Sequence, residues 1–287
     1  MKFKVQSMRW PYNCQACFCL RVDIDTIRDA EAIQAVLNLL KDYDVKATFF
    51  VATGRDDSGR NLPKALSRAV KGKYLRRYGL GLLRGLLLPS TSVEDAFLSQ
   101  RKILDIGHEI GLHGYWHRNW IRNAQRWSME EAEGNIEKGL DLFVKSFGFK
   151  PVGFAAPGFV AGQNVLMALQ KSGFVYTSNL KLENGQPFQP RVDGKKLSFL
   201  EMVVTCPTLE ELIFQGFSEE KALEFIKKNF DRTIETGGYF CYYVHPSFEA
   251  YVAPDYLESL LSDELSSGDI WAPTLREAAE WWRRGNP

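Results

Sequence analysis

The sequence has little of what would place the protein in a membrane or secreted class. No apolar run approaches the roughly 20 residues that a membrane-spanning helix needs. The basic residues at its start are not followed by the apolar stretch of a secretory signal peptide. Its five cysteines are odd in number and form no disulfide framework, so we expect reduced thiols and a cytoplasmic location.

Acidic residues are absent from residues 58–93. Eight cations lie in this stretch and the whole chain carries +1, so the stretch is +8 and the remainder −7. Such asymmetry indicates a local anionic partner. We do not expect nucleic acid to be that partner, because no motif for it is present.

Residues 73–90 mix these cations with leucines and glycines. This mixture favours a segment at a membrane interface, where anionic lipid attracts each nearby cation by about 1 kcal/mol. A helical hairpin that packs its leucines on the rest of the protein is the alternative, but it does not explain the missing acids. The residues expected to face the membrane are Arg76, Arg77, Leu82, Arg84 and Leu86.

Strand-like and helix-like segments alternate along the chain. Residues 46–51 read as a buried strand, while 28–41 and 129–147 have the apolar spacing of helices. The alternation predicts an α/β fold with a mostly parallel sheet closed into a barrel. We see no repeat or long linker, and therefore expect one catalytic domain over 1–287 with a basic and apolar insertion at about 54–90.

Histidine is rare, and two of the four histidines lie close together. On a helical turn or tight loop, His113 and His117 would lie roughly 5–6 Å apart and could share a metal ion. On a strand they would be about 13 Å apart and could not. Gly114 makes a sharp turn plausible. The pair alone is equally compatible with two exposed loop histidines.

Asp23 and Asp25 end the first apolar strand. Residues two apart on a strand face the same side, and two carboxylates there are costly to bury without a cation or donors. The alternative, Asp25 as the N-cap of the following helix, leaves Asp23 unexplained. One Asp on a metal with two His leaves open positions for water and substrate, as in catalytic sites.

The other two histidines differ in their expected roles. His245 follows a β-rich run, so at the carboxyl end of a barrel strand it would join the same mouth and could protonate a leaving amine. In isolation it would read as a solitary loop histidine. His108 lies on the strand side of the turn, and we expect it to be packed and hydrogen-bonded.

In combination these motifs resemble the NodB-homology polysaccharide deacetylases, the carbohydrate esterase family 4. The likeness runs nearly end to end, and within the family the chain is similar to the deformylases of polyprenyl-phosphate-linked 4-formamido-arabinose. The matching segments are RVDIDT (21–26), ATFFV (47–51), GRDDSGR (54–60), GHEIGLH (107–113), QPFQPR (186–191), VTCPTLEE (204–211) and YVHPSFE (243–249).

The resemblance implies a distorted (β/α) barrel in which Asp25, His113 and His117 hold one divalent metal ion. Zinc is favoured, and cobalt, nickel or manganese would suit the same ligands. Asp23 would be the general base and His245 the general acid in removing a formyl or acetyl group from an amino sugar. That sugar would be polyprenyl-phosphate-linked, at the inner face of the cell membrane. The expected oxyanion and substrate contacts are Pro157, Gly158, Phe159, Trp116, Asn179 and Arg55.

Two positions depart from the family's pattern. The family usually has an arginine two residues before the motif proline, where it orients the base. Here that position is Ala155, so Asp23 must find another partner or none. The arabinose deformylases tend to have Asn-Ser-Asp after the fifth strand, whereas this chain has Thr177-Ser178-Asn179, which leaves the sugar open.

Three other functions stay open. Non-haem iron oxygenases also use two His and one carboxylate, but typically take them from an H-x-D/E run, whereas here Asp comes first and H-x3-H follows. A non-catalytic glycan- or lipid-binding relative would have a damaged centre, which only Ala155 suggests. A deacetylase of a soluble amino sugar, peptidoglycan or chitin is the third, and the lack of a signal peptide disfavours an extracellular polymer.

Overall fold

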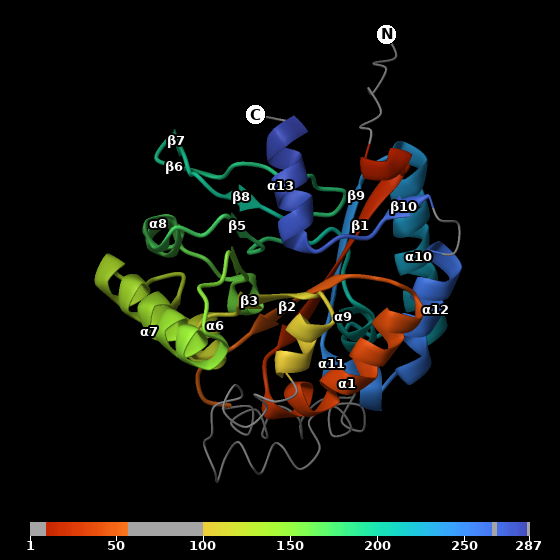
Figure 1. Cartoon of the computed structure of the whole chain (residues 1–287), viewed down its shortest axis with the longest axis horizontal. Helices are drawn as coiled ribbons and strands as arrows, with labels where there is room; N and C mark the ends of the chain where they lie inside the picture. The colour runs from red at the N-terminus through yellow and green to blue at the C-terminus, as the bar shows by residue number, and fades with distance from the viewer. Residues whose placement is uncertain (1–9, 57–99, 266–268, 286–287) are drawn as a thin grey trace.

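The centre of the molecule is a curled sheet of parallel strands (Figure 1). This computed structural model describes residues 10–56, 100–265 and 269–285. From β1 the sheet runs through β2, β3, β4 and β5 to β8, while β9 pairs with the other side of β1 and β10 with its first residues. The strands are β1 (Ala16–Ile24), β2 (Ala47–Val51), β3 (Glu109–Leu112), β4 (Gly153–Phe154), β5 (Tyr176–Thr177), β8 (Leu200–Glu201), β9 (Tyr239–Val244) and β10 (Ile270–Trp271).

The two ends of the curled sheet approach each other beyond β8. The backbone N–H of Thr205 donates to the carbonyl of Cys241 in β9 over 2.9 Å, and the hydroxyl of Thr205 accepts from the N–H of Cys241. Among the described residues, this pair alone joins the two ends by backbone hydrogen bonds, so the barrel is only partly closed. The predicted distorted (β/α) barrel is confirmed.

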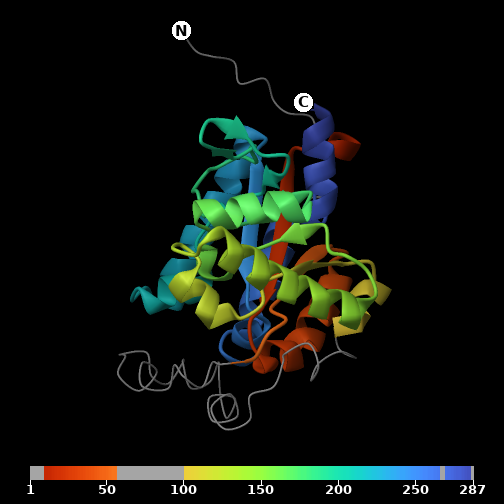
Figure 2. The same cartoon turned by 90° about the vertical axis from the view of Figure 1, so that its left-hand side faces the viewer.

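Helices cover the outside of this sheet, with α7 and α8 over one side and α1, α10 and α12 over the other (Figures 1 and 2). Both views place α13 beside the amino end of β1 and α1 beside its carboxyl end. The long helices are α1 (Ile27–Asp42), α7 (Met129–Phe147), α8 (Gln163–Ser172), α10 (Glu219–Thr236), α12 (Pro254–Leu265) and α13 (Leu275–Gly285). The short helices and the hairpin are η1 (Pro11–Asn13), α6 (His117–Asn123), η3 (Pro157–Phe159), β6 (Arg191–Val192), β7 (Lys195–Lys196), α9 (Leu209–Phe214) and α11 (Pro246–Tyr251).

β1 is buried on both faces, as parallel strands covered by helices are. Val22 and Ile24 belong to the larger apolar cluster, which includes the inner faces of the helices. Cys17 and Cys19 belong to the smaller cluster inside the barrel. Because side chains alternate along a strand, Arg21 and Asp23 share the interior face with these cysteines.

The start of α1 decides whether Asp25 is its N-cap. Thr26, and not Asp25, is the N-cap of α1: its side chain accepts from the N–H of Asp29, and the Asp29 carboxylate accepts from the N–H of Thr26. This reciprocal pair is a capping box. The N-cap interpretation of Asp25 is therefore wrong, and its carboxylate is left for other partners.

The predicted insertion at about 54–90 lies almost entirely outside the described residues. The membrane-facing residues expected there, Arg76, Arg77, Leu82, Arg84 and Leu86, are among those not described. The membrane segment and the single-domain boundaries therefore stay predictions. In the described part of the chain, no helix combines the length and the apolar character that crossing a bilayer requires.

Candidate active site

Four side chains meet at the mouth of the barrel, where β1, β3 and β9 end. Asp25 follows β1, His113 follows β3, His117 begins α6 and His245 follows β9. Asp25 Oδ1 lies 3.2 Å from His113 Nε2, and Asp25 Oδ2 lies 3.2 Å from His117 Nε2 and 3.3 Å from His245 Nε2. The structure thus brings together residues that are up to 220 positions apart in the sequence.

The two neighbouring histidines are joined by a tight turn. The rings of His113 and His117 have centroids 5.2 Å apart, which agrees with a turn and excludes a continuous strand. Gly114 has a φ of +67°, and a Cβ there would lie 3.0 Å from the Trp120 ring and 3.1 Å from Pro157. Glycine is therefore required to bring His117 back toward His113.

The chemistry of this donor set fits a divalent metal ion. One ligand atom each from Asp25, His113 and His117 lie within 4.8 Å of one another. His113 Nδ1 lies 2.9 Å from the Ala155 carbonyl, to which it donates, so its Nε2 lone pair faces Asp25 Oδ1. That carboxylate oxygen is buried and accepts no hydrogen bond among the described residues. His113 Nε2 and Asp25 Oδ1 are thus two acceptors that face each other. A cation bound by both would satisfy them.

Charge is concentrated around Asp25. Burial alone would raise the pKa of Asp25, but the neighbouring His117 and His245 hold that pKa well below its usual value. Burial would likewise lower the pKa of His117, and the Asp25 carboxylate raises it above the ordinary histidine value. Asp25 is therefore ionised at neutral pH, the state in which a carboxylate binds a metal ion.

Asp23 has a partner that sequence reasoning missed. Arg21 donates from Nε to Asp23 Oδ1 and from Nη2 to Asp23 Oδ2, both over 2.7 Å. The side chains are 0% and 3% exposed. Burial would lower the pKa of Arg21, but the Asp23 carboxylate raises it, so the guanidinium stays charged. A signal was present: in RVDID, residues 21, 23 and 25 fall on one face of the strand.

Glu210 is a second missed residue. Its Oε2 lies 2.9 Å from His245 Nδ1, and its side chain is 7% exposed. Glu210 lies in α9, which Thr208 caps. Because 35 residues separate the two partners, no spacing in the sequence could have indicated this pair.

The expected substrate contacts are placed unevenly around the mouth. Pro157, Gly158 and Phe159 form η3, in which Gly158 and Phe159 both have a φ of +59°. The Phe159 ring contacts Tyr243, with centroids 5.2 Å apart. Asn179 Oδ1 accepts from the N–H of Ala156 over 2.9 Å, which ties the loop after β5 to η3.

The two remaining contacts are less constrained. Trp116 is the N-cap residue of α6 and is half-buried beside the histidines. Arg55 is exposed just before the segment that the structure does not describe. No interaction among the described residues joins Arg55 to the cluster, so its role stays a prediction.

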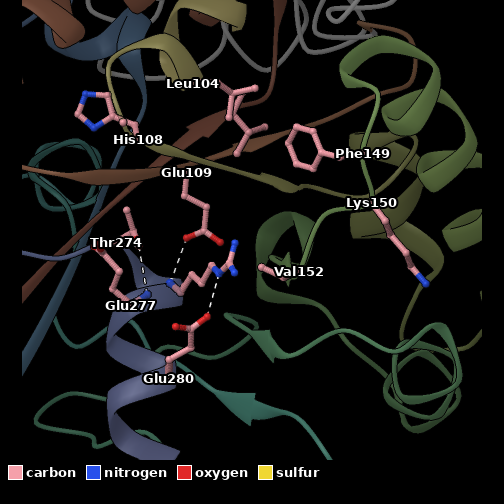
Figure 3. A pocket seen from close by; sticks show the side chains of 12 residues that line it. Leu104, His108, Glu109, Phe149, Lys150, Val152, Thr274, Glu277 and Glu280 are labelled. Atoms are coloured by element: carbon pink, nitrogen blue, oxygen red, sulfur yellow. Dashed lines mark hydrogen bonds and ion pairs between the residues drawn. The ribbon is translucent and has the colours of Figure 1, made fainter.

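A separate hollow of about 380 Å³ opens at the other end of the barrel (Figure 3). Here the N–H of Ala47 donates to His108 Nδ1 over 3.2 Å, and the His108 ring packs beside Phe49. The expected structural role of His108 agrees with these contacts. Glu109 lies beside it and accepts from Thr48 and Tyr176.

Fold and site together define a (β/α)-barrel protein with a candidate Asp-His-His metal centre. A family model described as polysaccharide deacetylase matches residues 16–177, more than half of the 287 residues. The chain therefore belongs to the polysaccharide deacetylase family. It is accordingly a hydrolase that acts on amides.

Curated relatives are similar over most of the chain. A probable 4-deoxy-4-formamido-L-arabinose-phosphoundecaprenol deformylase from Shewanella sediminis is 28% identical over 89% of this chain and 84% of its own. A protein of the same name from Wigglesworthia glossinidia brevipalpis is 26% identical over 80% and 81%. The peptidoglycan deacetylase of Helicobacter pylori is 28% identical, but over 53% and 51% only.

Solved structures share the fold at low identity. A probable polysaccharide deacetylase from Pseudomonas aeruginosa PAO1 aligns with a TM-score of 0.71 at 16% identity, over 97% of this chain and 94% of that one. The Puue allantoinase aligns with a TM-score of 0.70 at 15% identity, over the same shares. At such identities the likeness concerns the fold alone.

Proposed function

We propose that the protein removes a formyl or acetyl group from the nitrogen of an amino sugar, using one divalent metal ion and the side chains at the mouth of the barrel. The observation that carries this proposal is the arrangement around Asp25. His113 and His117 each lie 3.2 Å from an oxygen of its carboxylate, and His245 lies 3.3 Å from Asp25 Oδ2. Asp23 lies 3.9 Å from His113. Ligands, a base and an acid thus surround one point.

Asp25, His113 and His117 would hold the ion, with zinc favoured and cobalt, nickel or manganese suited to the same donors. When bound there, a divalent ion would lower the pKa of water and polarise the amide carbonyl. Ala155 fixes the tautomer of His113 through its carbonyl, and this orientation keeps Nε2 directed at the site.

Asp23 is the proposed general base. Its carboxylate lies 3.9 Å from His113 Nε2, close enough to accept a proton from a water molecule held beside the ligands. Each of its oxygens already accepts from Arg21, and a carboxylate has about four acceptor sites. Sites therefore remain for the water.

His245 is the proposed general acid. With Nδ1 hydrogen-bonded to Glu210, its Nε2 faces the mouth. The contact with the Glu210 carboxylate fixes the ring, so that Nε2 can deliver its proton to the departing nitrogen. The free amine is then the leaving group.

The turn after β4 is the proposed oxyanion site. The N–H of Phe159 donates to Ala156 and that of Val160 to Pro157, whereas the N–H of Gly158 has no acceptor among the described residues. Asn179 Nδ2 is buried and equally without an acceptor there. Both donors lie close to the same turn, where the charge of a tetrahedral intermediate would be held.

For the substrate we propose a polyprenyl-phosphate-linked amino sugar at the cytoplasmic face of the membrane. The names of the two relatives similar over most of the chain support it, since both are probable deformylases of a phosphoundecaprenol-linked sugar. The predicted basic and apolar insertion at about 54–90 of the single domain would meet the anionic membrane surface. Trp116, Phe159 and Arg55 are the proposed sugar contacts.

The test measures metal content and amine release on the same samples of wild type and His113→Ala. The substrates are N-formyl and N-acetyl amino sugars, free and polyprenyl-phosphate-linked. Wild type is expected to carry about one divalent ion per chain and to release amine, and the variant to lose both. A wild type that takes up no metal under any loading would refute the mechanism.

The rival interpretation as a non-catalytic relative rested on Ala155. Asp23 has an arginine partner in Arg21 instead, which favours the enzyme. An oxidation assay with ferrous iron would separate the hydrolase from an iron oxygenase.

A further inference from the structure

Arg21 is a fully buried arginine that pairs with the proposed base, Asp23. Its two donors to Asp23 form a parallel pair of equal length, 2.7 Å each. Such a fork fixes the plane of a carboxylate as well as its position. A lysine at the same place would supply charge without that plane.

The guanidinium has further partners from elements that are far apart in the sequence. Nη1 donates to the carbonyl of Ser178 over 2.6 Å and contacts its hydroxyl at 3.1 Å. Its central carbon lies 4.7 Å from the ring centroid of Phe159, 5.3 Å from that of Phe50 and 5.7 Å from that of Tyr243. Arg21 thus contacts β2, β9, η3 and the loop after β5.

The loop after β5, residues 178–180, is itself held by hydrogen bonds to Glu201. Glu201 in β8 accepts from the N–H groups of Asn179 and Leu180 and from the hydroxyl of Thr177. Burial raises the pKa of Glu201 to about 6, while its hydrogen bonds and Arg21 act in the opposite direction. The loop that receives Arg21 is therefore anchored at three points.

We propose that Arg21 is the positioning residue of the base: it sets the plane of the Asp23 carboxylate and joins it rigidly to η3 and the 178–180 loop. This rests on the proposed function, in which Asp23 accepts the proton of the attacking water. Arg21 does not touch the substrate. Its role is to keep the base and the oxyanion turn in one fixed arrangement, which a side chain of equal charge and different shape cannot do.

The first test is Arg21→Lys, with metal content, melting temperature, kcat and KM measured beside wild type. We expect a loss of about 10- to 100-fold in kcat, as displacements of about 1 Å in a reacting group cause. Metal content and the visible spectrum of the cobalt-loaded protein should not change, because Asp23 is not a ligand, and KM should stay within about twofold. A cobalt-loaded Arg21→Lys with wild-type kcat would overturn the proposal.

If Arg21→Lys does not fold, a relocated arginine tests the same idea. Ala155 is buried in the same interior cluster as the rings that surround Arg21. In the pair Arg21→Leu and Arg21→Leu/Ala155→Arg, the double variant should recover at least about tenfold in kcat over the single one, if a fork on Asp23 is what counts. A folded, metal-loaded double variant no more active than the single one would count against the proposal.

Failure of the proposed function is recognised separately. If wild type releases no amine from any substrate, that function falls. Crystal structures of wild type and Arg21→Lys then still decide the positioning role. The Asp23 carboxylate should rotate away from its wild-type plane in the variant, and an unchanged plane would refute it.

Discussion

Both ends of the barrel contain a buried carboxyl group and a histidine, but the pKa values of these groups are shifted in opposite directions at the two ends. At the mouth, Asp25 lies among histidines, and their charge holds its pKa well below the usual value. At the far end, burial raises the pKa of Glu109 to about 7, because the hydrogen bonds from Thr48, Tyr176 and the N–H of Arg276, together with the Arg276 charge, offset its desolvation only in part. Whether a buried carboxylate is ionised or protonated thus depends on how far its neighbours offset the cost of burial.

The histidines show the same contrast. Asp25 raises the pKa of His117, whereas burial and the nearby Lys46 lower that of His108 to about 4. His108 is therefore neutral throughout the physiological range and suits a fixed hydrogen bond. Residue type alone distinguishes neither end, but the balance between burial and the surrounding charges does.

The largest expected effect is a difference in activity between a variant at the mouth and a variant at the far end. Asp25→Asn should abolish metal binding and lower kcat/KM by at least about 1000-fold, since metal polarisation supplies several kcal/mol of transition-state stabilisation. Glu109→Gln is the matched control, one buried carboxyl changed to an amide at the far end. Metal content and amine release of Glu109→Gln should be close to those of wild type. A similar loss in Glu109→Gln would mean that the two ends of the barrel do not differ in function.

The second effect tests the general acid. His245→Gln should lower kcat by about 100- to 10,000-fold with metal content retained, because proton donation to the leaving nitrogen is lost. Glu210→Gln should lower it less, since the histidine stays in place. His108→Gln is the control, and steady-state kinetics should leave it close to wild type. A His245→Gln variant that loses its metal would instead make His245 a ligand.

The third effect is on stability at the far end. Because the pKa of Glu109 is about 7 in the fold and 4.5 in the unfolded chain, the folded state binds more protons between those values. The contribution of Glu109 to stability should therefore fall as pH rises through that window, by about 3 kcal/mol in all. Denaturant unfolding of wild type and Glu109→Gln from pH 4.5 to 7.5 measures this contribution as the difference between the two proteins. Parallel curves for both proteins would contradict the raised pKa.

The fourth effect, also at the far end, has the opposite sign. The pKa of His108 is about 4 in the fold and 6.5 when unfolded, so the unfolded chain binds the extra proton between those values. Stability from this residue is present above pH 6.5 and is lost as pH falls toward 4. Melting temperatures of wild type and His108→Gln over that range should converge as pH falls. If they do not, the imidazole is exposed to water.

The site features predicted correctly from the sequence depend on the spacing of residues near one another in the chain. The alternation of β1 placed Asp23 and Asp25 on one face, and the glycine between His113 and His117 indicated the turn that joins them. These features depend on residues near one another in the chain, which pattern reasoning can compare.

Partners distant in the chain were not predictable in this way. Glu210 reaches His245 only through the packing of α9, a six-residue helix too short to show a clear apolar period. Arg21 is close to Asp23, but an arginine is almost never fully buried unless it is paired. Its pairing becomes evident only when Ser178 and Phe159 are seen to complete its surroundings.

The alternation of charged and apolar residues in β1 also restricts how this strand can pair as the chain folds. Arg21, Asp23 and Asp25 follow one another at every second position, with Val22 and Ile24 between them. A slip of one residue against β2 or β9 would turn the three charged groups into the apolar layer under the helices. Mispaired forms of this strand are therefore strongly disfavoured, and a chain that has formed its sheet has at the same time brought together the groups proposed to act in catalysis.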